Sequence, residues 1–222
     1  MDPNILQSIE QLMPRYEAEL PFSKEKVTFT PFRVKDAKNI SIILQEENKK
    51  LSLVALVEIL KTNTQGVNVL DLCLADAEYL FLQIRSKSVD ERLNLIRNEE
   101  KLQLYIFDIK HKNEIITETV NISPEIHLVL ETPTINNLIK LNSLEKEELI
   151  KSCIKKIVVK NEIYYPNKFI PKDLKDLLDN LPMSMLGKFE NFLANQPELY
   201  AMLETKDGPK EVSGFLNFFI FR

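Results

Sequence analysis

The stretch Ala75-Asp76-Ala77-Glu78-Tyr79-Leu80-Phe81-Leu82-Gln83-Ile84-Arg85-Ser86-Lys87-Ser88 is the most informative part of the chain. Its apolar side chains recur every three or four residues, which is the period of an α-helix, so we expect a helix over residues 74–87. A helix with two apolar faces is either sandwiched in the core or presents one face to a partner. One stripe consists of Cys73, Ala77, Leu80, Phe81 and Ile84, and the opposite stripe consists of Ala75, Tyr79 and Leu82.

Other segments of the chain show the same helical period. In one of them, residues 144–157, the expected buried stripe is Leu149, Ile150, Cys153, Ile154 and Ile157. Prolines flank the alternating residues 26–30, which predicts a short N-terminal strand. Besides 74–87, we expect helices over residues 2–18, 35–46, 50–62, 144–157, 171–181 and 183–195, with a further helical stretch from residue 134.

Near residue 101 the apolar period changes from about 3.6 to about 2, which is typical of strands. Residues 102–107 alternate, the chain turns at 110–113, and residues 116–122 return as the second strand of a hairpin. A third short strand is expected at 126–130. A second hairpin is expected over residues 199–213, turning at Lys206-Asp207-Gly208-Pro209.

These patterns predict an α+β protein that is mostly helical, with two short β-hairpins and a short N-terminal strand. The change of period places a boundary near residue 98. Residues 1–97 would form a mainly helical N-terminal lobe, and residues 98–222 would form a C-terminal lobe of mixed helix and hairpin. A single continuous domain is the alternative.

The composition argues against several classes of protein. The 222 residues include four glycines, without the close spacing of the glycine-rich loops in Rossmann and P-loop enzymes. The net charge is −4 and both signs are mixed along the chain, so nucleic-acid binding is not expected. No apolar run approaches the roughly 20 residues that span a bilayer, and no secretion signal is recognisable. We expect a protein without membrane contact that stays in the cytoplasm or joins a particle assembled there.

The cysteines and histidines do not form a pattern that indicates a metal site or catalysis. Cys73 and Cys153 are 80 positions apart, and His111 and His127 lie near neither, whereas zinc ligands normally come in close pairs. We expect reduced core cysteines, no metal or other cofactor, no catalytic residues and no small-molecule substrate. A hydrolase that uses scattered carboxylates is the enzymatic alternative.

The C-terminal segment concentrates apolar side chains, with four of the twelve phenylalanines in seven residues. Such a terminus is normally docked, either on its own chain or on another. Together with the second stripe of the 74–87 helix, it is a candidate contact surface. The candidate partner-binding residues are Ala75, Tyr79, Leu82, Arg85, Phe215, Phe218, Phe219 and Phe221.

Six short pieces carry a family resemblance through their shared order. They are Leu20-Pro21-Phe22, Val27-Thr28-Phe29-Thr30-Pro31-Phe32, the residues 75–88 quoted above, Ile126-His127-Leu128-Val129-Leu130-Glu131-Thr132-Pro133-Thr134, Cys153-Ile154-Lys155-Lys156-Ile157 and Gly214-Phe215-Leu216-Asn217-Phe218-Phe219. Over residues 20–221 the chain resembles the small baseplate hub and hub assembly proteins of T-even-like contractile-tailed bacteriophages. It departs from their pattern at Ile84, where the family has leucine before the arginine.

A second departure concerns the two expected hairpins. Many members of the family carry cysteine pairs there that resemble zinc ribbons, but this chain reads Lys110-His111-Lys112-Asn113 and Lys206-Asp207-Gly208-Pro209. As a relative, it would hold its hairpins together by packing and hydrogen bonds alone.

The resemblance implies a non-enzymatic role in building the central hub of the tail baseplate, by contacts with other hub or tail proteins. The chain would work in the host cytoplasm during assembly, in the virion baseplate, or in both, and the residues do not decide between them. The alternative is a regulatory protein-binding module unrelated to tail structure.

Overall fold

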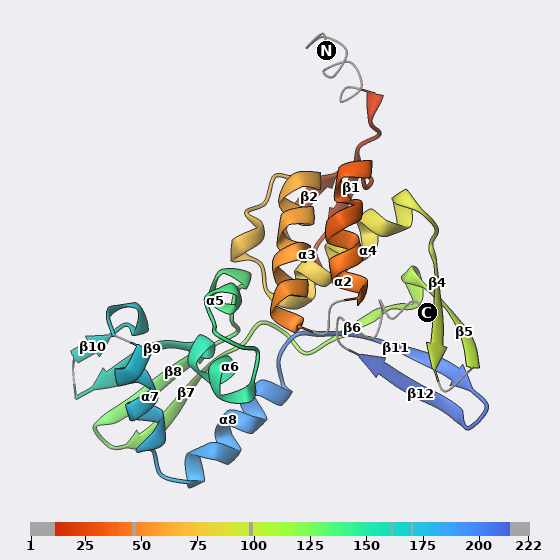
Figure 1. The fold of residues 1–222 in the computed structure, drawn as a ribbon. Coiled ribbons are helices and arrows are strands. Elements are labelled where there is room, and N and C mark those ends of the chain that lie inside the picture. The colour runs from red at the N-terminus through yellow and green to blue at the C-terminus, as the bar shows by residue number, and fades with distance from the viewer. Residues whose placement is uncertain (1–11, 46–47, 98–99, 161, 170, 214–222) are drawn as a thin grey trace. The chain divides into compact units, whose positions relative to one another are not determined.

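The computed structural model describes residues 12–45, 48–97, 100–160, 162–169 and 171–213. The chain forms two compact units (Figure 1). Unit 1 contains residues 1–112 and 198–222, and unit 2 is the continuous segment 113–197. The boundary expected near residue 98 falls inside unit 1, between the strands β4 (Arg92–Arg97) and β5 (Glu100–Tyr105).

Unit 1 begins with an antiparallel sheet of order β1-β2-β3, formed by β1 (Tyr16–Glu19), β2 (Lys26–Phe29) and β3 (Thr64–Gln65). Alternation in β2 buries Val27 and Phe29 and confirms the strand expected at 26–30. The prediction of a helix over residues 2–18 is wrong at its C-terminal end, because residues 16–18 belong to β1. This strand pairs with β2 and places the rings of Tyr16 and Phe29 5.7 Å apart. Residues 2–11 of that prediction lie outside the described residues.

The helices α2 (Ala37–Gln45), α3 (Lys49–Asn63) and α4 (Leu74–Ser88) confirm the predictions at 35–46, 50–62 and 74–87. Helix α2 lies beside α3, which also packs on α4 (Figure 1). Asn48 caps α3, since its side chain accepts hydrogen bonds from the amides of Lys50 and Leu51. Two 3-10 turns, η1 (Val34–Asp36) and η2 (Val69–Asp71), precede α2 and α4.

The rest of unit 1 is β-structure. The hairpin β4–β5 leads through η3 (Ile106–Asp108) into β6 (Lys110–Lys112). After unit 2 the chain returns as β11 (Glu198–Thr205) and β12 (Gly208–Ser213), which gives a sheet of order β12-β11-β6. The β11–β12 hairpin confirms the one expected at 199–213. Gly208 at its turn has φ = +99°, a conformation that favours glycine.

Unit 2 contains an antiparallel sheet of order β10-β9-β8-β7. Its strands are β7 (Thr117–Ser123), β8 (Ile126–Glu131), β9 (Ile154–Val159) and β10 (Glu162–Tyr164). Its helical elements are α5 (Ile135–Ile139), α6 (Lys146–Cys153), η4 (Pro166–Lys168), α7 (Pro171–Asp179) and α8 (Ser184–Ala194). Strand β8 and helices α7 and α8 confirm the predictions at 126–130, 171–181 and 183–195.

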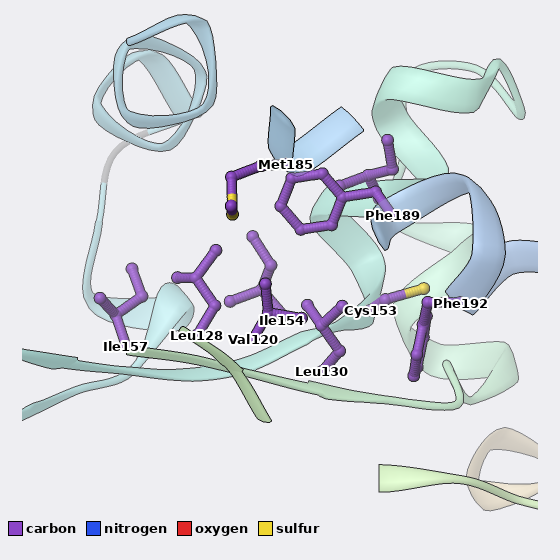
Figure 2. Packing of buried hydrophobic residues seen from close by; sticks show 10 residues of the cluster. Val120, Leu128, Leu130, Cys153, Ile154, Ile157, Met185, Phe189 and Phe192 are labelled. Atoms are coloured by element: carbon purple, nitrogen blue, oxygen red, sulfur yellow. The ribbon is translucent and has the colours of Figure 1, made fainter. Parts of the chain in front are cut away.

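The hydrophobic core of unit 2 lies between α8 and the sheet (Figure 2). Met185, Phe189 and Phe192 are spaced by four and three residues, so they share one face of α8. Burial of each such side chain contributes about 1.5–3 kcal/mol, so this helix–sheet contact accounts for much of the stability of unit 2. On the side of the sheet, the buried residues are Val120, Leu128, Leu130, Ile154 and Ile157.

The predicted fold class, mostly helical with two short hairpins, is wrong, because the described residues form twelve strands in four sheets. The first predicted hairpin does not form. Strand β5 pairs with β4, and β7 pairs with β8, so residues 102–105 and 117–123 belong to different sheets. Both segments are extended as expected, but their partners are set by packing with other parts of the chain.

The helix expected over 144–157 ends at Cys153, because Ile154 and Ile157 belong to β9. The pairing of β9 with β8 shifts at Lys155, which is an extra residue between the pairs Leu130–Ile154 and Val129–Lys156. This β-bulge turns Ile154 and Ile157 to the same core despite their spacing of three. The bulge therefore imitates the period of a helix.

Candidate functional site

Helix α4 holds the first candidate surface, and most of that surface is buried inside unit 1. The exposed fraction is 2% for Ala75, 1% for Leu82 and 9% for Arg85. Tyr79 is half-buried, and burial raises the pKa of its phenol. The opposite stripe is buried as well, which favours the interpretation of a sandwiched helix. A partner contact at these four residues stays a prediction.

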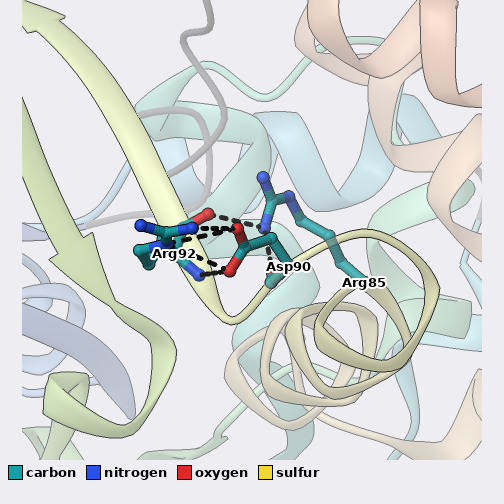
Figure 3. Close-up of polar contacts among 3 residues, drawn as sticks. All are labelled: Arg85, Asp90 and Arg92. Carbon is teal, nitrogen blue, oxygen red and sulfur yellow. Dashed lines mark hydrogen bonds and ion pairs between the residues drawn. The ribbon is translucent and has the colours of Figure 1, made fainter.

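Arg85 binds the turn that joins α4 to β4 (Figure 3). Its Nη1 donates to the backbone carbonyls of Asp90 at 2.9 Å and of Arg92 at 3.2 Å. Burial lowers the pKa of Arg85, and the nearby negative charge of Asp90 acts in the opposite direction. The carboxylate of Asp90 in turn forms an ion pair of 3.0 Å with Arg92. Arg85 is thus a structural cation that fixes the start of β4.

Two further polar side chains of α4 bind distant segments of unit 1. The buried carboxylate of Asp76 accepts hydrogen bonds from the amides of Phe22 at 3.0 Å and Ser23 at 2.9 Å. The hydroxyl of Ser88 accepts one from the amide of Phe32 at 2.7 Å. The sequence analysis did not identify these roles. The helix contains several other polar residues, so no sequence signal singled out these two.

The second candidate surface is the aromatic tail with Phe215, Phe218, Phe219 and Phe221. These residues lie outside the described residues, which end at Ser213. Their partner contact therefore stays a prediction as well.

The structure adds an exposed apolar run on unit 2 that the sequence analysis missed. Ile163, Tyr164 and Tyr165 follow one another at the end of β10, with exposed fractions of 51%, 39% and 45%. The ring of Tyr164 lies 6.4 Å from the ring of Phe169, which packs against the core. The hydroxyl of Tyr164 donates to Glu162, and this hydrogen bond, together with the negative charge of Glu162, raises the pKa of the phenol. We call Ile163, Tyr164 and Tyr165 the β10 surface.

A pocket of about 280 Å³ lies beside the β10 surface, within unit 2. Tyr165 lines it together with Cys153 and Ile154. The charged residues in its lining, Glu131 and Lys155, form an ion pair of 2.7 Å. Because these charges neutralise each other, the side chains that line the pocket carry no net charge.

Unit 1 carries an exposed pair of aromatic rings next to β6. The rings of Tyr105 and Phe107 are stacked, with centroids 5.0 Å apart and planes inclined by 21°. Their exposed fractions are 41% and 70%. We call these two residues the aromatic pair.

Both thiols are buried, and each histidine contacts a neighbouring side chain. Burial raises the pKa of the Cys73 thiol to about 12, helped by the charge of Asp76, and that of Cys153 to about 11. Both are therefore protonated at neutral pH, and a protonated thiol is a poor nucleophile and metal ligand. His111 contacts the ring of Phe22, and His127 hydrogen-bonds the side chain of Asn121 at 2.8 Å. No cluster of three or more potential metal ligands occurs among the described residues.

Exposed aromatic side chains on both units are features of a protein that works through contact surfaces. The chain belongs to the family described as T4 bacteriophage base plate protein, whose match covers residues 13–220. It is therefore a structural protein of a T4-like phage baseplate, and its family implies contacts with other baseplate proteins. This confirms the resemblance drawn from the six sequence pieces.

No protein with curated annotation and no solved structure matches the chain. Within the described residues, every helix is too short or too polar to cross a bilayer.

Proposed function

We propose that this chain is a component of the baseplate hub or a factor in hub assembly, and that it acts without catalysis by binding other baseplate proteins. The family match supports the baseplate. The observation that carries the binding role is the β10 surface, where three consecutive large apolar residues are exposed.

Among the described strands, β10 pairs with β9 alone and ends the sheet order β10-β9-β8-β7, so its outer edge has no strand partner there. Successive side chains of a strand point to opposite faces, so Ile163 and Tyr164 present apolar area on both sides of this edge. An open edge can accept an extended partner segment by main-chain hydrogen bonds, while side chains beside it provide specificity. Tyrosine is also enriched at protein interfaces.

The edge strand β12 of unit 1 offers a contrast. It carries Pro209, which has no amide hydrogen to donate, and Lys210, which forms an ion pair of 2.9 Å with Asp207. Proline and lysine on an edge strand are common protections against pairing. Strand β10 lacks both residue types, so it is the better candidate for a partner strand.

The test is a full-length double variant, Ile163→Glu with Tyr165→Glu. When the tagged double variant is isolated from infected cells, we expect baseplate proteins to be absent from the isolate. The thermal midpoint of the double variant should equal that of the native chain. The control is Met183→Glu on the same unit, where Met183 is 84% exposed. Full recovery by the double variant would overturn the role of β10. Recovery of host proteins alone by the native chain would favour the regulatory module instead.

Quantitative mass spectrometry of purified virions and of the infected-cell lysate separates the two forms of the proposal. A fixed, small copy number per particle identifies a hub subunit. Abundance in the lysate with absence from particles identifies an assembly factor. If the chain accompanies tail proteins in neither fraction, the hub role is overturned.

A further inference from the structure

The aromatic pair of unit 1 is held on a fixed stretch of backbone. Between its two members, Ile106 is buried, and its amide donates to the carbonyl of Glu91 at 2.9 Å. The buried side chain and the hydrogen bond of Ile106 therefore fix the backbone between Tyr105 and Phe107. An exposed aromatic surface on a rigid element indicates a docking site.

The strand register brings the last described residue close to this pair. Ser213 pairs with Tyr200, and Tyr200 pairs with Lys110. Because neighbouring strands are about 4.8 Å apart, the Cα atoms of Ser213 and Lys110 are about 10 Å apart. Phe107 precedes Lys110 by three residues, which is at most about 11 Å of chain.

The segment after Ser213 is long enough and apolar enough to reach and cover the pair. Residues 214–222 can span about 30 Å when extended, more than the distance to Phe107. They read Gly-Phe-Leu-Asn-Phe-Phe-Ile-Phe-Arg, with six large apolar side chains that are unfavourable in water.

We propose that the tail, residues 214–222, docks on the aromatic pair of its own chain in the free protein. The phenylalanines of the tail supply rings that complement the exposed faces of Tyr105 and Phe107. This contact lies in unit 1 and is independent of the β10 surface, so either proposal can fail without the other.

The sequence contains no tryptophan, so the variant Phe107→Trp carries a unique fluorophore in the full chain. In the proposed state its emission is blue-shifted and its quenching by acrylamide is weak. Replacing Phe215, Phe218, Phe219 and Phe221 by serine in the same chain should shift the emission to the red and raise the quenching constant severalfold. The proposal is overturned if acrylamide fully quenches the indole at residue 107 while the tail is intact. This outcome does not depend on whether the serine variant folds.

The matched control is Val34→Trp, because Val34 is 95% exposed on the same unit, and its emission should not respond to the tail. Other occupants of the aromatic pair give different results, each of which contradicts the proposal. Shielding of Trp at residue 107 that disappears on dilution identifies a second copy, and shielding that appears only with a baseplate extract identifies a partner. Shielding that survives the serine substitutions in a folded chain identifies another segment.

Discussion

The hydroxyl of Ser88 accepts a hydrogen bond of 2.7 Å from the backbone amide of Phe32, 56 positions earlier in the chain. The same hydroxyl donates to the carbonyl of Ile84 at 2.6 Å, within its own helix. Together with Asp76 and Arg85, it makes α4 the element that holds three separate segments of unit 1. Residues 75–88, one of the six pieces that carry the family resemblance, therefore serve mainly the interior of the fold.

Replacement of Ser88 by alanine should destabilise unit 1. The substitution leaves the amide of Phe32 without its acceptor in a part-buried position, which costs about 1–3 kcal/mol. We expect urea unfolding, measured by circular dichroism, to show a lower midpoint and an unchanged slope of the transition.

Ser86→Ala is the control for this effect. Ser86 lies on the same helix, and its hydroxyl donates to the carbonyl of Gln83, three residues earlier, so this bond does not join a second segment. Its loss should change the unfolding free energy much less. Equal midpoints for the two variants would show that the bond to Phe32 contributes little.

The buried stripe of α4 gives a second prediction. Leu82→Ala should lower the unfolding free energy by about 2–5 kcal/mol, because Leu82 is 1% exposed and its truncation leaves a cavity. Tyr79 belongs to the same stripe and is half-buried. Tyr79→Phe keeps its ring, so it should leave the unfolding free energy nearly unchanged. Thermal unfolding of both variants measures the difference. A stable Leu82→Ala protein that no longer binds baseplate proteins would instead assign Leu82 to a partner contact.

The pKa of Cys153 predicts a loss of stability at alkaline pH. Burial raises the pKa of this thiol from 9.0 to about 11, so above pH 9 the unfolded chain releases a proton that the folded chain retains. The contribution of the protonated Cys153 thiol to the unfolding free energy is fully present below pH 9. It declines by about 1.4 kcal/mol per pH unit as the pH rises towards 11.

The check is urea unfolding of the native chain and of Cys153→Ala at pH 8 and pH 10. Other groups titrate in this range, so the informative quantity is the difference between the two proteins. We expect the native chain to lose more unfolding free energy than the variant between the two pH values. Equal losses would mean that Cys153 ionises alike in the folded and unfolded states.

Elements defined by a local pattern were predictable from the sequence. Helix α4 follows from its apolar period, and the β11–β12 hairpin follows from alternation on either side of Asp207-Gly208. Strand pairing was not predictable, because residues 102–105 and 117–123 pair with strands whose choice depends on the whole fold. The bulge at Lys155 gave β9 the appearance of a helix, and no local signal reveals a bulge.

The candidate contact surfaces show the same limit. Periodicity identified the apolar stripe of Ala75, Tyr79 and Leu82, but it could not show that other parts of unit 1 cover Ala75 and Leu82. The β10 surface gave no amphipathic signal, because it consists of the last two residues of a short edge strand and the residue that follows them. Exposure is a property of the assembled unit, so a helical or strand period cannot predict it alone.

The chain leaves unit 1 after Lys112 and returns at Glu198, and these two residues pair in register between β6 and β11. During synthesis, β6 therefore leaves the ribosome well before its partner strand, and the 85 residues from Asn113 to Pro197 must be translated between them. At about 5–20 residues per second this takes several seconds. Unit 2 is continuous in sequence, so it can form before the β12-β11-β6 sheet of unit 1 is complete.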